Sequence, residues 1–195
     1  MKKISFVFIT CFLISTTGCS SIISTFRTTP INENYGERTW GSFFDDASIE
    51  TKARVNLNKT DPALDKAHLV VVSYNGIVLL AGQVPNERLK SLAGETVKKV
   101  RKVRRVHNEL LIAGPSSTLA RINDSWLTTK IKSRLLLTPG VPSGRIKVVC
   151  ENGEIFLFGL LTREESQRTV DAVQKSYGIQ KIVKMFEYID DASRY

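Results

Sequence analysis

Histidine and cysteine are scarce in this sequence, which has two of the first and three of the second among 195 residues. His68 and His107 each lie beside a predicted strand, and no spacing of histidine and cysteine suits a metal site. No glycine-rich loop precedes a predicted helix, as phosphate binding requires, and no serine stands in a nucleophile elbow. We therefore expect no catalytic residue, no metal and no cofactor, and predict that the protein is not an enzyme.

The N-terminus lacks an apolar run long enough to cross a membrane. The run at residues 4–14 is about half of the ~20 residues that a membrane-spanning helix needs. It follows two lysines and leads to the sequence TTGC at residues 16–19, so it is typical of a signal peptide. These four residues resemble the bacterial lipobox, in which the chain is cut before an acylated cysteine, although Thr16 stands where leucine is usual.

The lipobox resemblance implies that residues 1–18 are removed and that Cys19 carries palmitate and other acyl chains. Because Ser20 follows rather than aspartate, it also implies delivery to the outer membrane, with the protein facing the periplasm. Three acyl chains exceed what stable anchoring requires. The alternative is an ordinary cleavage site with an unmodified Cys19.

Export would also limit disulfides and partners. Cys11 is lost with the signal peptide and Cys19 is lipidated, so only Cys150 remains, and we expect it to be a small buried residue in a strand. The net charge of +9 falls to +7 when Lys2 and Lys3 are removed. A basic protein in the envelope meets lipid head groups, lipopolysaccharide phosphates or peptidoglycan carboxylates. Nucleic acid is excluded as a partner by the export signal.

Two similar segments follow a serine- and threonine-rich stretch, and they lie near 77 residues apart. The sequence DASIETK at 46–52 matches DSWLTTK at 124–130, and YNGIVLLAG at 74–82 matches ENGEIFLFG at 151–159. Such a consistent offset indicates a duplicated unit. We expect a signal peptide at 1–18, a lipidated tether at 19–44, domains at 45–113 and 123–191, and a linker at 114–122.

Each copy has the same predicted order of elements, α-β-β-α-β. A helix is expected to start after a capping aspartate, which is Asp45 or Asp46 in the first copy and Asp124 in the second. Two strands joined by an Asn-Gly turn follow, at 68–74 and 77–81 or at 146–150 and 154–158. A second helix at 86–100 or 163–176 leads to a last strand at 106–112 or 182–189. The predicted class is α+β, with a small mixed three-stranded sheet covered on one face by two helices.

Each copy resembles a BON domain in its Asn-Gly hairpin, the strand that follows, and Gly82 or Gly159. Together with the N-terminal features, two such copies resemble the dual-BON lipoproteins of the outer membrane. This resemblance implies binding of anionic phospholipid by the second domain. It also implies support of outer-membrane integrity, with enrichment at the division septum.

The first helices of the two copies differ on one face. Leu127, Ile131 and Leu135 form a stripe at ~100° per residue, and the first copy matches them with apolar residues, so this stripe is predicted to face the core. Trp126 and Leu137 lie within about 20° of each other, far from that stripe. The first copy has Ser48 and Lys59 in their places.

Tryptophan with basic neighbours suits the surface of a bilayer. The predicted phospholipid-binding residues, on the helix that the resemblance also favours, are Trp126, Lys130, Lys132, Ser133, Arg134, Leu136 and Leu137. An alternative is that Trp126 and Leu137 pack against the other domain or the tether. The rival function is a protein–protein adaptor for envelope assembly or for cell-wall machinery.

A second basic cluster interleaves with valines spaced by three, which we expect to face the core. It consists of Lys98, Lys99, Arg101, Lys102, Arg104 and Arg105. It fits a solvated helix end, whose dipole favours positive charge. The functional alternative is an auxiliary contact with lipopolysaccharide or lipid phosphates.

Overall fold

The computed structural model describes residues 36 and 38–190, so the predicted signal peptide and Cys19 lie outside the described residues. The first domain, as we use the term below, consists of α3 (Trp40–Thr60), α4 (Pro62–Lys66), β1 (Leu69–Tyr74), β2 (Ile77–Val84), α5 (Glu87–Lys98), β3 (Arg105–Asn108) and β4 (Leu111–Ile112). The second consists of α6 (Thr118–Leu137), η2 (Ser143–Arg145), β5 (Ile146–Glu151), β6 (Glu154–Leu161), α7 (Arg163–Gln174) and β7 (Lys181–Tyr188). No helix in these ranges is long and apolar enough to cross a membrane.

The mixed sheets that we predicted are confirmed in both domains. β1 runs antiparallel to β2, while β3 and β4 run parallel to β2. In the second domain β5 is antiparallel to β6, and β7 is parallel to it. The last strand of the first copy was expected to be continuous but is interrupted at residues 109–110. There the side chain of Asn108 accepts a hydrogen bond from the Leu110 amide, and the Leu110 side chain is fully buried.

Both first helices begin more than a turn before the predicted aspartates. The side chain of Thr39 caps α3 by accepting from the Ser42 amide, and that of Ser117 caps α6 by accepting from the Ala120 amide. A hydroxyl at this position satisfies a helix N–H group as well as a carboxylate does. The expected starts at Asp45 or Asp46 and at Asp124 are therefore wrong. Helix α3 begins inside the expected tether, and α6 begins inside the expected linker.

The central strand of each sheet is buried on both faces. Successive residues of a strand point to opposite sides, so Val78 and Leu80 of β2 contact the helices of their own domain. The residues between them face the second domain, where they meet the alternate residues of β6. This shared cluster contains Ile77, Leu79, Ala81, Phe156, Phe158 and Met185.

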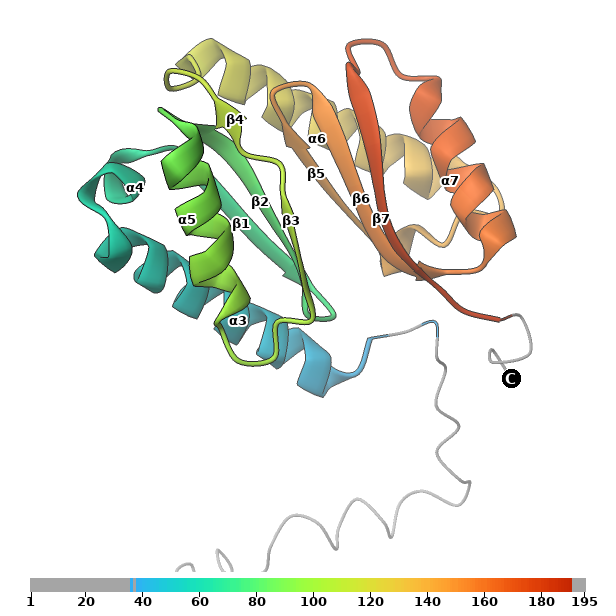
Figure 1. The fold of residues 1–195 in the computed structure, drawn as a ribbon. Helices are drawn as coiled ribbons and strands as arrows, with labels where there is room; N and C mark the ends of the chain where they lie inside the picture. Colours follow the sequence, from blue (N-terminus) through green and yellow to red (C-terminus); the bar gives the residue numbers. More distant parts are fainter. Residues whose placement is uncertain (1–35, 37, 191–195) are drawn as a thin grey trace, which may run out of the picture. The chain divides into compact units, whose positions relative to one another are not determined.

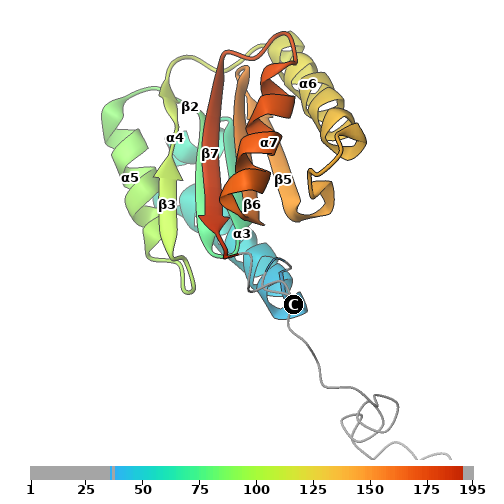
Figure 2. The same cartoon turned by 90° about the vertical axis from the view of Figure 1, so that its right-hand side faces the viewer.

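The two sheets therefore pack against each other through the faces that their helices leave open. Helices α3 and α5 cover the first sheet, and α6 and α7 cover the second (Figures 1 and 2). The rings of Tyr74 and Phe158 stack with their centres 6.0 Å apart. Our sequence reasoning covered one face of each sheet only. The continuous apolar run of β2 was the signal for a strand buried on both sides.

Polar groups at the edge of this interface are paired across it. The Tyr74 hydroxyl donates to the Arg145 carbonyl at 2.7 Å, and the Gln83 side chain donates to Glu151 at 3.0 Å. Gln83 and Glu151 are both buried, and an unpaired buried polar group would cost about 1–3 kcal/mol. These bonds therefore favour one alignment of the two sheets over others.

Candidate functional site

The outer face of α6 carries large apolar side chains that nothing in the described part of the chain covers. Trp126 is 60% exposed and Leu137 is 80% exposed, and Leu136 beside it is also exposed. Neither Trp126 nor Leu137 packs against the first domain, which was one of the two alternatives for their positions. Most of the tether, the other alternative, lies outside the described residues. The opposite face of the helix holds Leu127 and its neighbours in the core, as predicted.

Two further residues extend this face, and sequence reasoning missed them. Leu119 and Ile122 are exposed and lie on the turns before Trp126. They were overlooked because we placed the helix start at Asp124. The capping residue Ser117 was the signal for an earlier start. We call the resulting surface the α6 stripe; it lies within an arc of about 60° and consists of Leu119, Ile122, Trp126, Ser133 and Leu137.

Basic side chains flank the α6 stripe. The Lys130 ammonium lies 4.9 Å from the centre of the Trp126 ring and 5.9 Å from that of Tyr177. Such a cation–π contact holds the lysine over the ring. In the described ranges, neither Lys130 nor Arg134 has a carboxylate within ion-pair distance. No carboxylate of the described residues therefore neutralises these two half-exposed charges.

Lys132 lies apart from Trp126 and the rest of the α6 stripe. It is exposed, but it sits about 120° round the helix from Trp126. It borders a cavity of about 620 Å³ that Tyr74, Arg145 and Lys147 also line. The structure thus brings Trp126, Lys130, Ser133 and Leu137 together, while Lys132 and Leu136 lie on one flank and Arg134 on the other.

A buried aspartate holds each first helix against the Asn-Gly turn. The Asp124 carboxylate accepts hydrogen bonds from the amides of Asn152 and Gly153 at 2.8 and 2.9 Å. Asp46 accepts from the amides of Asn75 and Gly76 at 2.7 and 2.9 Å. These aspartates therefore fix the direction of α3 and α6 and do not cap them, which explains why both recur in the repeat.

Cys150 lies in β5, half-buried, and its thiol donates to Asp124 at 3.3 Å. Burial, followed by the bond to this carboxylate, raises the pKa of the thiol well above its ordinary range. The thiol is therefore protonated and a poor nucleophile at neutral pH.

Among the described residues, neither histidine lies beside a nucleophile. His68 contacts Glu151 of the second domain at 3.4 Å. Burial, followed by the nearby Arg105, lowers the pKa of His107, so this ring is uncharged at neutral pH. Residues 38–190 contain no cluster of histidine, cysteine, aspartate and glutamate that could hold a metal ion.

The basic cluster after α5 has the predicted pattern. Val97 and Val100 are buried in the core of the first domain, and the charged residues between and after them are exposed. Two of the charges are paired: Lys102 with Asp45 at 2.6 Å and Arg104 with Glu187 at 2.7 Å.

Comparison with known proteins agrees with this architecture. The model of the BON domain matches residues 45–114 and 123–190. The chain therefore belongs to the BON-domain family and contains two copies of the domain.

Two curated relatives cover most of the chain. It is 39% identical over 154 residues to Outer membrane lipoprotein DolP of Haemophilus influenzae, which covers 78% of this chain and 79% of that protein. It is 33% identical over 153 residues to the 21 kDa hemolysin of Actinobacillus pleuropneumoniae, with 78% of each chain covered. Among solved structures, the C-terminal domain of CdsD of Chlamydia trachomatis is 15% identical over 74% of this chain and 67% of its own, with a TM-score of 0.30. A score this low carries no argument about function.

Proposed function

We propose that this protein is an outer-membrane lipoprotein, anchored through Cys19 and facing the periplasm, whose α6 stripe binds anionic phospholipid. In this role it supports the integrity of the outer membrane, including at the division septum, without catalysing a reaction. Three observations support the anchor: the apolar run at residues 4–14, the lipobox-like sequence before Cys19, and the name of the Haemophilus relative.

The α6 stripe is the observation that carries the lipid-binding proposal. Four large apolar side chains recur over five turns of one helix with no cover in the described residues, and Lys130 lies over the tryptophan ring. An amphipathic helix of this kind lies in the plane of the interface with its apolar face at the acyl boundary. Tryptophan is favoured at the depth of the head groups, and lysine and arginine reach their phosphates.

The expected energies fit reversible binding that the anchor reinforces. Transferring a Trp126 or Leu137 side chain from water to the acyl boundary is worth about 1.5–3 kcal/mol. Each basic residue near an anionic surface adds about 1 kcal/mol. A lipid anchor on the same chain raises the effective concentration of the bilayer, so modest binding by the stripe is sufficient.

Sedimentation with vesicles tests this proposal. The chain from Ser20 to Tyr195, which retains every described element, is mixed with vesicles of phosphatidylglycerol or of phosphatidylethanolamine. We expect binding to the anionic vesicles and a 30- to 100-fold loss of affinity in Trp126→Glu, which corresponds to roughly 2–3 kcal/mol. Circular dichroism checks that the fold is retained.

The matched control is Ser125→Glu, which adds the same charge on an exposed position about 100° round α6. We expect it to lower affinity far less, because it leaves the apolar stripe intact. If the protein binds neither type of vesicle, direct lipid binding is excluded, and the α6 stripe is then a surface for docking an envelope protein. Equal losses in the two variants would mean that charge alone drives binding.

A further inference from the structure

The first domain exposes its own group of aromatic side chains. Trp40 is 81% exposed and Phe44 is 66% exposed, and Phe43 between them is also exposed. All three lie on the first two turns of α3, the helix that corresponds to α6 in the repeat. The helix that we expected to lack an aromatic face therefore has one, but at its N-terminal end. Residues 40–44 were missed because we assigned them to the tether.

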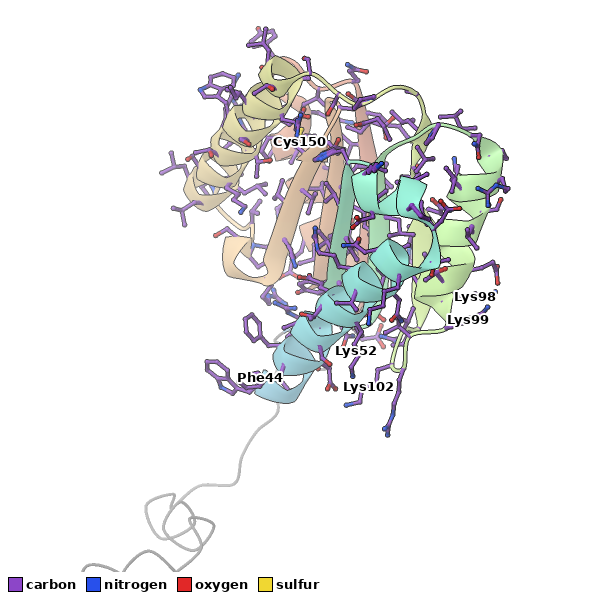
Figure 3. The ribbon with its side chains drawn as sticks, turned by 90° about the vertical axis from the view of Figure 1, so that its left-hand side faces the viewer. Phe44, Lys52, Lys98, Lys99, Lys102 and Cys150 are labelled. Carbon is purple, nitrogen blue, oxygen red and sulfur yellow. The ribbon has the colours of Figure 1, made fainter. Side chains whose placement is uncertain are left out.

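A basic loop contacts the same end of α3, on the side of the helix that carries Asp45. We use the name basic loop for the six basic residues from the last residue of α5 to the first residue of β3, which are Lys98, Lys99, Arg101, Lys102, Arg104 and Arg105. The Lys102 ammonium contacts the carboxylate of Asp45, the residue that follows Phe44, at 2.6 Å. Figure 3 shows Phe44, Lys52 and Lys102 toward the same end of the first domain.

Most basic side chains of the loop, and Lys52 on α3, have no carboxylate partner in the described part of the chain. Lys52, Lys98, Lys99, Arg101 and Arg105 have no carboxylate within ion-pair distance among residues 38–190. Packing accounts for the valines of this segment but not for the charges between them. The corresponding turn of the second domain, residues 175–181, contains only two charged residues, Lys175 and Lys181. The concentration of charge is therefore a property of the first domain alone.

We propose that the aromatic turn and the basic loop form a second membrane-contact surface, separate from the α6 stripe. Trp40, Phe43 and Phe44 enter the head-group region of an anionic bilayer, and the basic loop with Lys52 contacts its phosphates. The repulsion among the clustered cations is relieved by an anionic surface. Each basic residue near such a surface is attracted to it, and the attraction is screened by salt.

The position of the surface in the chain favours a bilayer over a protein as its occupant. Trp40 follows Cys19 by 21 residues, which reach at most about 75 Å when fully extended. An anchor at Cys19 therefore keeps the aromatic turn close to the membrane at high effective concentration. The choice of this membrane rests on the proposed anchor, whereas the surface itself does not depend on the α6 stripe.

The two tryptophans of the chain allow the two surfaces to be tested separately. Trp126→Phe leaves Trp40 as the only tryptophan and keeps an aromatic residue in the α6 stripe. With vesicles of phosphatidylglycerol, we expect the emission of Trp40 to shift to shorter wavelength and to be quenched by brominated lipid. High salt should weaken this response.

Charge reversal then tests the basic loop. We expect Lys98→Glu with Lys99→Glu to raise at least fivefold the lipid concentration at which Trp40 responds. The matched control is Lys59→Glu with Lys66→Glu, which makes the same charge change at exposed positions toward the other end of α3 and in α4. It should change the response less than twofold. Equal effects of the two pairs would overturn a local role for the loop.

The outcome for each tryptophan separates this inference from the proposed function. If Trp40 remains in water on vesicles that bind the protein, the second surface is refuted, and the aromatic turn is then free to dock a protein. If Trp40 responds but Trp126, observed in Trp40→Phe, does not, the α6 site fails while the first-domain surface stands.

Discussion

Removing the Asp124 carboxylate should destabilise the second domain more than any change on its surface. In Asp124→Ala the amides of Asn152 and Gly153 lose their acceptor, and so does the Cys150 thiol. Asn152 and Gly153 both have positive φ, 56° and 73°. This turn therefore depends on the carboxylate to hold it in an uncommon conformation.

The size of the effect follows from these contacts. A hydrogen bond to a charged group contributes about 1.5–3 kcal/mol, and Asp124 accepts two from backbone amides while being 6% exposed. Partial access of water to the turn reduces the loss, so we expect about 3–5 kcal/mol. For two domains that unfold together as one unit of about 150 residues, that corresponds to a fall in Tm of roughly 10–15 °C.

Urea unfolding and thermal melts followed by circular dichroism measure this loss. Asp65→Ala is the control, because Asp65 is an exposed aspartate in the first turn of α4, where its loss should cost less than about 1 kcal/mol. A loss below 1 kcal/mol in Asp124→Ala would refute the conclusion that the buried aspartate holds the helix against the hairpin.

Other positions give independent expectations. Gly82→Ala should destabilise far more than Gly159→Ala in thermal melts, because a Cβ at Gly82 (φ 112°) would lie 2.0 Å from the His68 carbonyl oxygen, whereas at Gly159 the nearest atom is 3.1 Å away; similar costs would contradict this. Phe156→Ala should cost about 3–5 kcal/mol in urea unfolding, because its buried side chain lies between the two sheets; a cost below 1 kcal/mol would mean that the sheets are not packed in solution. At pH 8 Cys150 should react with a disulfide reagent much more slowly in the folded than in the unfolded protein, since its raised pKa keeps the thiol protonated below that pKa; equal rates would be inconsistent with this burial.

The fold of each domain was accessible from the sequence because its signals are local and repeated. The Asn-Gly turns and the 77-residue offset predicted the element order. The helical spacing of Leu127, Ile131 and Leu135 predicted the core face of α6. The packing of sheet on sheet was harder to predict, because it joins residues such as Leu79 and Phe156 that no local pattern relates. The unbroken apolar runs in β2 and β6 were the signal that a second face had to be covered.

The candidate site was predictable in its centre but not in its extent. Trp126 and Leu137 stood out because the sister helix has Ser48 and Lys59 in their places. Leu119 was missed because Asp124 was taken for the N-cap of α6, whereas the N-cap is Ser117. The same error assigned Trp40 to the tether. In both copies the aspartate that recurs in the repeat is explained by contacts 28 to 30 residues away, which helix-cap rules do not describe.

The depth of Trp126 in a bilayer tests the central claim most directly. In Trp40→Phe, Trp126 is the only tryptophan, and lipids brominated at different positions along the acyl chain report its depth. The proposed function predicts a shift to shorter wavelength on phosphatidylglycerol vesicles, with the strongest quenching by bromines near the head group. An unchanged spectrum on vesicles to which the protein is bound would contradict insertion of the α6 stripe.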